Sequence, residues 1–315
     1  MASDGTVSRA SRKVLWGIGI LVVLLVLIGG AFFPVGGDHL WHRVLATYRL
    51  RGIYVTKDNT GPIQPYAFGI FGPKLHHVAD SKGTLGDFAE VGGTRVAVLQ
   101  DATSHAYRVQ ELSPQYKTID TESGHYAAIT VSLDGSLVAY AHSTTTEELS
   151  SRFSSWEVRL VDIKNGTSMT LGTGFGPQFI KRDGKTLLVY TSRYGITVFD
   201  TSTKKSFSTP FKLPNDIGYS VKVSSDGEHL ALRDILTRTF NLYTVPRIDA
   251  ETPVGIQLSK ADVHTAKDIT LTPHAAYYLE VQGTQAYMRS VAYDVSSQGA
   301  VLYTFPVALG TRLIP

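Results

Sequence analysis

The amino-acid sequence predicts an all-β fold: a six-bladed β-propeller of four-stranded blades, preceded by one N-terminal transmembrane helix. Three observations support this prediction. Residues 14–37 carry no charged side chain. Residues 51–315 contain many short apolar or alternating runs that end in Gly or Asp-Gly, as strands do. These runs also recur at a period of roughly 40–50 residues, while helical periodicity is scarce.

The chain divides into four parts by composition. Residues 1–13 form a basic cytoplasmic tail, residues 14–37 a transmembrane signal-anchor helix, residues 38–50 a juxtamembrane linker or helix, and residues 51–315 the propeller domain. Roughly 20 apolar residues span a bilayer as a helix. Basic residues precede the span and Asp38 follows it, so the positive-inside rule keeps the N-terminus cytoplasmic. We therefore expect a single-pass protein of the cell membrane whose C-terminal domain is extracytoplasmic.

A cleaved signal peptide is the alternative to an anchor. The apolar run is longer than a typical signal core and no A-x-A site follows it, but Gly29-Gly30-Ala31 is small enough for cleavage. A buried core helix fits poorly because the run is apolar all round. Within residues 38–50 the apolar side chains recur at helical spacing, which predicts a short helix with its apolar side on lipid or on the domain.

The propeller prediction depends on repeated copies of a hairpin. Each copy has a short strand, a tight turn and a strongly apolar second strand, followed by a third strand and a short fourth strand. Asp and Gly suit such turns because they tolerate positive φ, so the aspartates need no calcium-binding role. The turns stand at residues 92, 134, 183, 226 and 273.

The remaining blade is predicted to join the two ends of the domain. Residues 51–80 hold about three strands, and the C-terminal residues 310–315 supply the missing one. Closure of this kind removes exposed sheet edges. A seventh blade would need about 40 further residues.

The hairpin motif resembles the repeat of TolB-like and WD-like β-propellers. Ser132–Gly135 and Ser224–Gly227 carry the Ser-x-Asp-Gly element, and Lys181–Gly184 matches it in part. The chain departs from the repeat by lacking the frequent Pro before Asp and, in two copies, the Asp-Gly itself. The resemblance implies a propeller fold and, from the TolB-like group, export and protein interaction. It implies no substrate, because propellers serve many unrelated functions.

Composition excludes several classes of chemistry. The chain has no cysteine, which excludes disulfides, Cys-ligated metals and thiol nucleophiles. Its net charge is only +3, so it lacks the basic field that binds nucleic acid. G-x-S-x-G, H-E-x-x-H and a phosphate loop with its Lys are all absent. The sequence therefore names no catalytic residue, no metal ligand and no cofactor.

Propellers commonly bind ligands on the face formed by the loops between blades and between second and third strands. On that face residues 143–156 form a longer polar insertion, which is either a binding loop or a tolerated surface excursion. Aromatic and histidine side chains gather there too; packing in the core or at the rim is the favoured role of each interblade aromatic residue, and ligand contact is the alternative. The candidate ligand-contacting residues are His125, Tyr126, Phe153, Trp156, Phe175, Tyr219 and His264.

These features favour a membrane-tethered extracytoplasmic propeller that binds a protein or a cell-envelope glycan without catalysis, with the bilayer as its partner through residues 14–37. One alternative is a hydrolase or lactonase that uses carboxylates in the central channel, with or without a divalent metal. The other is an accessory subunit of a cell-envelope complex that makes its contact through the span. A stoichiometric metal in the purified protein would favour the enzyme.

Overall fold

A computed structural model of the chain describes the propeller domain and the helix that precedes it. The described residues are 20–21, 23–24, 34–35, 38–56, 64–77, 83–101, 103–144, 155–192, 195–208, 220–233, 239–245, 248, 257–296, 299–306 and 312–314. The predicted transmembrane helix therefore lies mostly outside them. Within the described part, no helix is both long and apolar enough to cross a bilayer.

Two short strands and a helix precede the ring. β1 (Pro34–Val35) pairs with β2 (Asp38–His39). The helix predicted over residues 14–37 thus does not include Pro34, because proline lacks the N–H that a helix interior requires. α2 (Leu40–Arg49) follows at once, within residues 38–50, where the sequence predicts a short helix.

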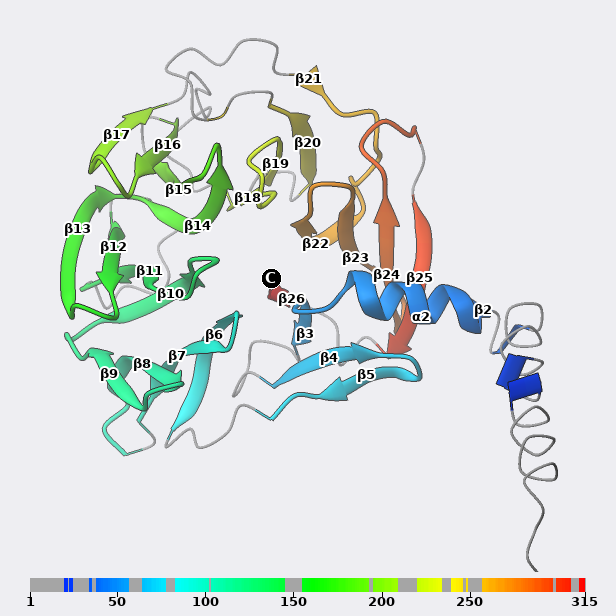
Figure 1. Ribbon diagram of the computed structural model, residues 1–315, viewed down its shortest axis with the longest axis horizontal. Helices are drawn as coiled ribbons and strands as arrows, with labels where there is room; N and C mark the ends of the chain where they lie inside the picture. The colour runs from blue at the N-terminus through cyan, green and yellow to red at the C-terminus, as the bar shows by residue number, and fades with distance from the viewer. Residues whose placement is uncertain are drawn as a thin grey trace, which may run out of the picture.

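The described residues after α2 form six four-stranded antiparallel sheets arranged as a ring (Figure 1). The six-bladed all-β architecture is therefore confirmed. Blade 1 has the strand order β26-β3-β4-β5, and blades 2 to 6 consist of β6–β9, β10–β13, β14–β17, β18–β21 and β22–β25. The first strand of each order lies nearest the centre of the ring.

The strand bounds are as follows. Blade 1 contains β26 (Arg312–Ile314), β3 (Tyr54–Thr56), β4 (Pro65–Gly69) and β5 (Gly72–Leu75). Blade 2 contains β6 (Thr84–Val91), β7 (Thr94–Gln100), β8 (Tyr107–Ser113) and β9 (Lys117–Asp120). Blade 3 contains β10 (His125–Val131), β11 (Leu137–Ser143), β12 (Glu157–Asp162) and β13 (Thr167–Thr173). Blade 4 contains β14 (Phe175–Arg182), β15 (Lys185–Ser192), β16 (Gly195–Asp200) and β17 (Lys205–Ser208). Blade 5 contains β18 (Ser220–Val223), β19 (His229–Arg233), β20 (Phe240–Thr244) and β21 (Gln257–Leu258), and blade 6 contains β22 (Ala266–Leu271), β23 (Ala276–Gln282), β24 (Gln285–Val291) and β25 (Ala300–Pro306).

Tight turns join the innermost and second strands of blades 2 to 6, where the repeat predicts them. In blade 4, Asp183 and Gly184 have φ of 48° and 77°, the paired positive values that such a turn needs. In blade 3, the Asp134 carboxylate instead accepts hydrogen bonds from Ser132 Oγ at 2.6 Å and from Ser136 N at 3.2 Å. Asp134 thus has the structural role expected of it.

The ring has two faces. The turns between first and second strands, and those between third and fourth strands, open on one face, which we call the turn face. The second-to-third strand loops and the connections between blades form the opposite face, the loop face. α2 reaches the ring from the turn face, because it leads into β3 at Tyr54, and Tyr54 pairs with Ile314 at the end of the innermost strand β26.

The core consists of apolar layers between neighbouring blades. Each apolar cluster of the described residues draws its side chains from two adjacent blades. Between blades 3 and 4, for example, Leu160 shares a cluster with Phe179 and Leu188. Strands inside a blade are therefore covered by a neighbouring blade on each side. β16, the third strand of blade 4, is buried at every position. Blade-to-blade packing holds the ring together.

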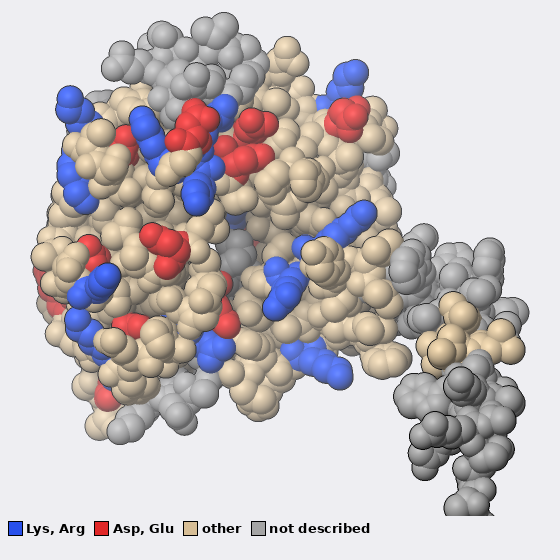
Figure 2. Space-filling model, in the orientation of Figure 1, with Lys and Arg blue, Asp and Glu red and all other residues tan. Residues whose placement is uncertain are grey.

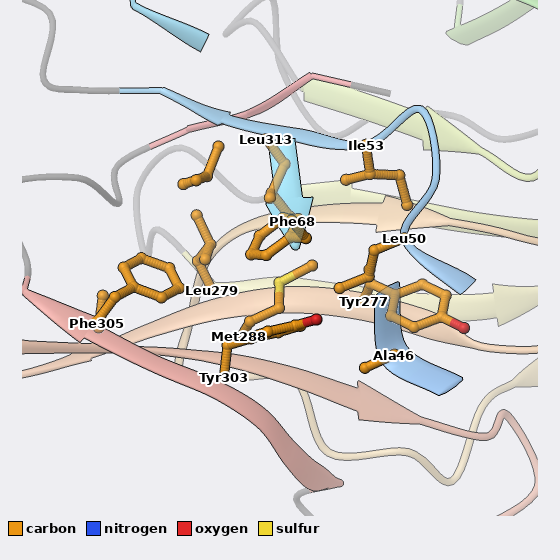
Figure 3. Packing of buried hydrophobic residues seen from close by; sticks show 12 residues of the cluster. Ala46, Leu50, Ile53, Phe68, Tyr277, Leu279, Met288, Tyr303, Phe305 and Leu313 are labelled. Carbon is orange, nitrogen blue, oxygen red and sulfur yellow. The ribbon is translucent and has the colours of Figure 1, made fainter. Parts of the chain in front are cut away.

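Blade 1 closes the ring by joining the two ends of the domain, as predicted. Leu313 of β26 pairs with Val55 of β3, and the C-terminus lies at the centre of the ring (Figure 1). Figure 3 shows the apolar cluster at this closure, in which Phe68 of blade 1 lies beside Met288 of blade 6. Leu50, just after α2, belongs to the same cluster and is 1% exposed. The helix is thus part of the closure.

Polar side chains on alternate innermost strands tie each of those strands to the next blade. Asp87, Gln178 and Asp268 each accept a hydrogen bond from a backbone N–H of the following innermost strand, at 3.2, 2.7 and 2.7 Å. We call these three residues the interblade braces. The equivalent positions of blades 3 and 5 are the apolar Ile129 and Val221. Interfaces with a brace therefore alternate with interfaces without one around the ring.

Candidate functional site on the loop face

The loop face is formed where the backbone passes from one blade to the next. Gly124, just before β10, has φ of 137°, and a Cβ there would lie 2.2 Å from the carbonyl oxygen of Ser143. Gly174, just before β14, would meet the carbonyl oxygen of Thr191 at 2.5 Å. Glycine therefore lets each connection lie directly against the end of the second strand of the blade that it enters.

The structure places five of the seven candidate ligand-contacting residues at this face. Tyr126 and Trp156 are only 6% and 5% exposed, so they support the surface from beneath. His125 and Phe175 are partly buried, and His264 is exposed. The two candidates outside the described residues are Phe153 and Tyr219.

Aromatic contacts join blades 2, 3 and 4 along the loop face. The rings of Trp156 and Phe175 lie edge to face with centroids 5.3 Å apart, across the interface of blades 3 and 4. Those of Tyr107 and His125 lie 5.4 Å apart, across the interface of blades 2 and 3. His264 stands apart, on the connection from blade 5 to blade 6. The described candidates therefore lie at two neighbouring blade interfaces, with His264 as a separate residue.

An ion-pair network lies next to Tyr126, between blades 2 and 3. Arg159 of β12 lies with its Nη1 3.2 Å from Asp120 Oδ2 and forms a second ion pair with Glu122. Tyr140 of β11 donates a hydrogen bond of 2.6 Å to the same Asp120 oxygen. The side chains of Asp120 and Arg159 are 14% and 15% exposed, whereas that of Glu122 is 49% exposed. The network therefore presents a carboxylate to solvent while its cation is largely covered.

The protonation states in the network are fixed near neutral pH. Burial raises the pKa of Asp120, but hydrogen bonds from Tyr140 and the Glu122 backbone, with the charge of Arg159, outweigh it and lower the pKa. Burial, followed by the Arg159 charge, lowers the pKa of His142 on β11 below its ordinary 6.5. At pH 7 the carboxylates are charged and His142 is neutral. The site is therefore suited to binding through constant charges and hydrogen bonds.

Sequence reasoning missed the network. Arg159 alternates with Val158 and Leu160, the pattern of an ordinary exposed position on a strand. Asp120 ends β9 and Glu122 follows in the short polar connection to β10, and neither position gave a signal in the sequence. Only the packing of blade 2 against blade 3 brings these side chains together. A hint was available in the Gly before β10, which marks a close approach of the backbone to its neighbour.

The carboxylates nearest the centre of the ring are already bonded. Asp87 Oδ1 and Oδ2 accept from two backbone amides, at 2.9 and 3.2 Å, and Asp268 does the same at 2.9 and 2.7 Å. In the part of the chain that the structure describes, no group of three or more His, Asp or Glu side chains is arranged to hold a metal ion. The described inner carboxylates thus have structural partners.

Comparison with known proteins shows the class of the fold. No family model matches the chain, and no curated protein matches it in sequence. Its structure is similar to that of TolB from Acinetobacter baumannii, with 16% identity and a TM-score of 0.51, over 79% of this chain and 64% of that one. This chain thus spans less than two thirds of TolB. The β-propeller domain of Myceliophteria thermophila Cps50 (Swd1) matches at 11% identity and a TM-score of 0.41, over 72% of this chain and 88% of that one.

At such identities the likeness to TolB is one of fold. The chain is a β-propeller similar to that of TolB, which supports the fold that the hairpin motif implied.

Proposed function

We propose that the chain is a membrane-tethered, extracytoplasmic propeller that binds a protein or a cell-envelope glycan on its loop face, without catalysis. The observation that carries this proposal is the position of α2. The helix that follows the apolar segment reaches the ring from the turn face, so the loop face points away from the tether and is open to a partner.

The proposed binding area is the loop face of blades 2 to 4. It offers the half-buried rings of His125 and Phe175 beside the solvent-exposed carboxylates of Glu122 and Glu157, which are 49% and 51% exposed. Aromatic faces next to fixed carboxylates suit the apolar and hydroxyl-bearing faces of a sugar, or a basic and aromatic patch of a protein. The insertion of residues 143–156 begins and ends in this area, at Ser143 and Trp156.

Crosslinking in the native membrane identifies the partner. Because the chain has no cysteine, a photoreactive group can be attached at Thr121→Cys on the loop face and, as a control, at His274→Cys on the turn face. Both residues are exposed. We expect protein or glycan adducts from the loop face alone. Adducts only from the turn face would contradict the proposed binding area.

A matched pair of charge reversals then tests the area with the captured partner. On the loop face, Glu157 Oε2 lies 3.9 Å from Arg159 Nη2, and the Glu157 side chain is 51% exposed. On the turn face, Glu228 Oε1 lies 3.8 Å from Arg182 Nη2, and the Glu228 side chain is 54% exposed. We expect Glu157→Lys to weaken binding about tenfold and Glu228→Lys to leave it unchanged. Equal effects of the two substitutions would remove the loop face from the proposal.

A further inference from the structure

The turn face carries an apolar rim on and beside blade 1. Phe71, in the turn between β4 and β5, is 81% exposed, and Tyr48 of α2 is 78% exposed. These are the most exposed large apolar side chains in the described part of the chain. Leu45, one helical turn before Tyr48, and Ile70, beside Phe71, are 38% and 37% exposed. We call these four residues the blade-1 rim.

Both parts of the rim are held on a fixed support. The inward side of α2 is buried through Ala46, which is 1% exposed, and Thr47 Oγ1 lies 2.7 Å from the hydroxyl of Tyr303 in blade 6. α2 also contacts β4, the strand that leads to Phe71. Leu45 and Tyr48 are three residues apart, so they share the outward side of the helix. The rim is therefore a preformed feature of the folded ring.

The charge around the rim is of one sign. The segments that carry the rim, residues 40–56 and 64–77, contain no Asp or Glu and contribute the exposed Arg49, Arg51 and Lys74, while Asp38 stands in β2 before the helix. Figure 2 shows basic but no acidic side chains over the region of α2, β4 and β5, whereas both signs are mixed over the rest of this face. Exposed aromatic rings bordered by basic side chains fit the interface of a bilayer with anionic headgroups.

The position of the blade-1 rim in the chain indicates which surface it contacts. α2 begins at Leu40, three residues after the uncharged segment 14–37 ends. The described residues of that segment, between Ile20 and Leu24, are helical, and their side chains are 48–58% exposed. β1 and β2 bring Pro34 beside His39, so a membrane span that ends before Pro34 lies close to the start of α2 and keeps this helix near the bilayer surface.

We propose that the blade-1 rim docks on the lipid headgroup region of the membrane that holds the chain, with Tyr48 and Phe71 in the interface and Arg49, Arg51 and Lys74 on anionic headgroups. This inference rests on the proposed tether. Docking fixes the ring with its turn face toward the bilayer and its loop face outward, so the ring does not move freely on a flexible linker.

Lipid-quenching fluorescence tests the proposal on the full chain. A polarity-sensitive fluorophore is attached at Phe71→Cys, at Tyr48→Cys or, as the far-face control, at Thr121→Cys. Each variant is reconstituted in vesicles of phosphatidylcholine and phosphatidylglycerol that contain a lipid with a shallow nitroxide. We expect blue-shifted emission and strong quenching at positions 71 and 48, little at 121, and weaker quenching when phosphatidylglycerol is omitted.

Two results would overturn the docking. Emission and quenching at position 71 equal to those at 121 would show that the rim faces water. Shielding from aqueous iodide without quenching by the lipid nitroxide would show that another protein surface, such as a second copy, covers the rim. Retention of the chain in the vesicle pellet after an alkaline carbonate wash reports the tether separately. Loss from the pellet therefore contradicts the proposed tether, and retention with an unquenched rim contradicts only the docking.

Discussion

Gly124 and Gly172 share a backbone conformation but differ in their surroundings. Their φ values are 137° and 125°, yet a Cβ at Gly124 would lie 2.2 Å from the Ser143 carbonyl oxygen, while nothing lies within 4 Å of one at Gly172. An alanine at either position meets the same backbone strain. Only at Gly124 must the end of β11 also move, and with it the base of the 143–156 insertion.

We therefore expect Gly124→Ala to destabilise the fold by about 3 kcal/mol and Gly172→Ala by about 1 kcal/mol. The difference isolates the steric term, because the strain is common to both. Urea unfolding followed by tryptophan fluorescence measures it. Equal losses for the two variants would show that the connection before β10 has room to shift.

The residue type of each interblade brace follows from the number of backbone N–H groups that donate to it. Asp268 accepts from the N–H of Ile269 and of Leu313 with its two oxygens, and Asp87 likewise serves two amides. For Gln178 the structure gives one such bond, to the N–H of Val223 at 2.7 Å, and an amide supplies that one acceptor. A carboxylate is thus required where two backbone donors converge.

Asp268→Asn keeps the shape of the brace but replaces one acceptor with a donor. We expect it to cost about 2 kcal/mol, because a backbone N–H beside the introduced NH₂ loses its partner. Gln178→Glu keeps its acceptor and serves as the control, with a smaller effect expected. Denaturation midpoints of the two variants give the comparison, and a neutral Asp268→Asn would remove the brace from the account of ring closure.

A second polar group lies between blades 1 and 2. Glu90 of β6 is bonded through both oxygens by Arg95, at 3.0 and 3.1 Å, and lies 3.0 Å from His76 Nε2 and 3.3 Å from Tyr54 OH. Burial raises the pKa of Glu90, but the hydrogen bonds from Arg95 and His76 outweigh it and lower the pKa below 4.5. Burial and the charge of Glu90 raise the pKa of Tyr54 to about 12.

The lowered pKa of Glu90 makes acid destabilise this interface. The folded state binds the proton less readily than the unfolded state, so the contribution is complete above the ordinary pKa and is lost as the pH falls through the folded value. We expect Glu90→Gln to cost about 2 kcal/mol at pH 7 and clearly less at pH 3. Urea unfolding at the two pH values measures this, and a loss that does not depend on pH would contradict the assignment.

At the scale of elements, the closing strand β26 has only three residues, yet it completes blade 1. Its Leu313 is fully buried between blades 6 and 1, and its N–H is the partner of the Asp268 brace. Without β26, β3 would present an unpaired edge to the channel, and unpaired edges promote association. A strand of three residues thus decides whether the sheet system is closed.

Removal of residues 311–315 should therefore lower stability by about 3 kcal/mol or more and produce oligomers. Removal of Pro315 alone is the control and should change little. Calorimetry and size-exclusion chromatography report the two effects. A truncated chain that stays monomeric with an unchanged melting temperature would show that β26 is dispensable for closure.

The elements were largely predictable from the sequence. Asp-Gly or Gly-Gly turns mark four hairpins, at residues 92, 134, 183 and 226, and a weaker copy at 273 marks a fifth. Their regular spacing predicts the number of blades. The split closing blade followed from the need to remove sheet edges. The strand β1 at Pro34 was missed, because two-residue strands carry no periodic signal.

The candidate site was less predictable, because it depends on packing between blades. The sequence places Tyr126 and Trp156 on the loop face, but only the structure shows that Tyr126 packs between blades 2 and 3 and that Trp156 contacts Phe175 of blade 4. Arg159 and Asp120 come from different blades, so no spacing along the chain links them. A sequence pattern reports which side of one strand is apolar and says nothing of which blade lies against it.

At the scale of the whole molecule, the two faces of the ring have different surroundings. The turn face carries α2 and the blade-1 rim, next to the apolar N-terminal segment. The loop face carries the aromatic contacts between blades 2, 3 and 4 and the Arg159 network. The sequence alone did not separate the faces in space, because the side on which α2 packs is a tertiary property. The proposed function depends on this separation.

Crosslinking in the native membrane tests this central claim most directly. With the photoreactive group at Thr121→Cys on the loop face and at His274→Cys on the turn face, the account predicts that a protein or glycan partner is captured from position 121 and not from position 274. Capture from position 274 alone would contradict it, since the surface that meets the partner would then be the one that carries the tether.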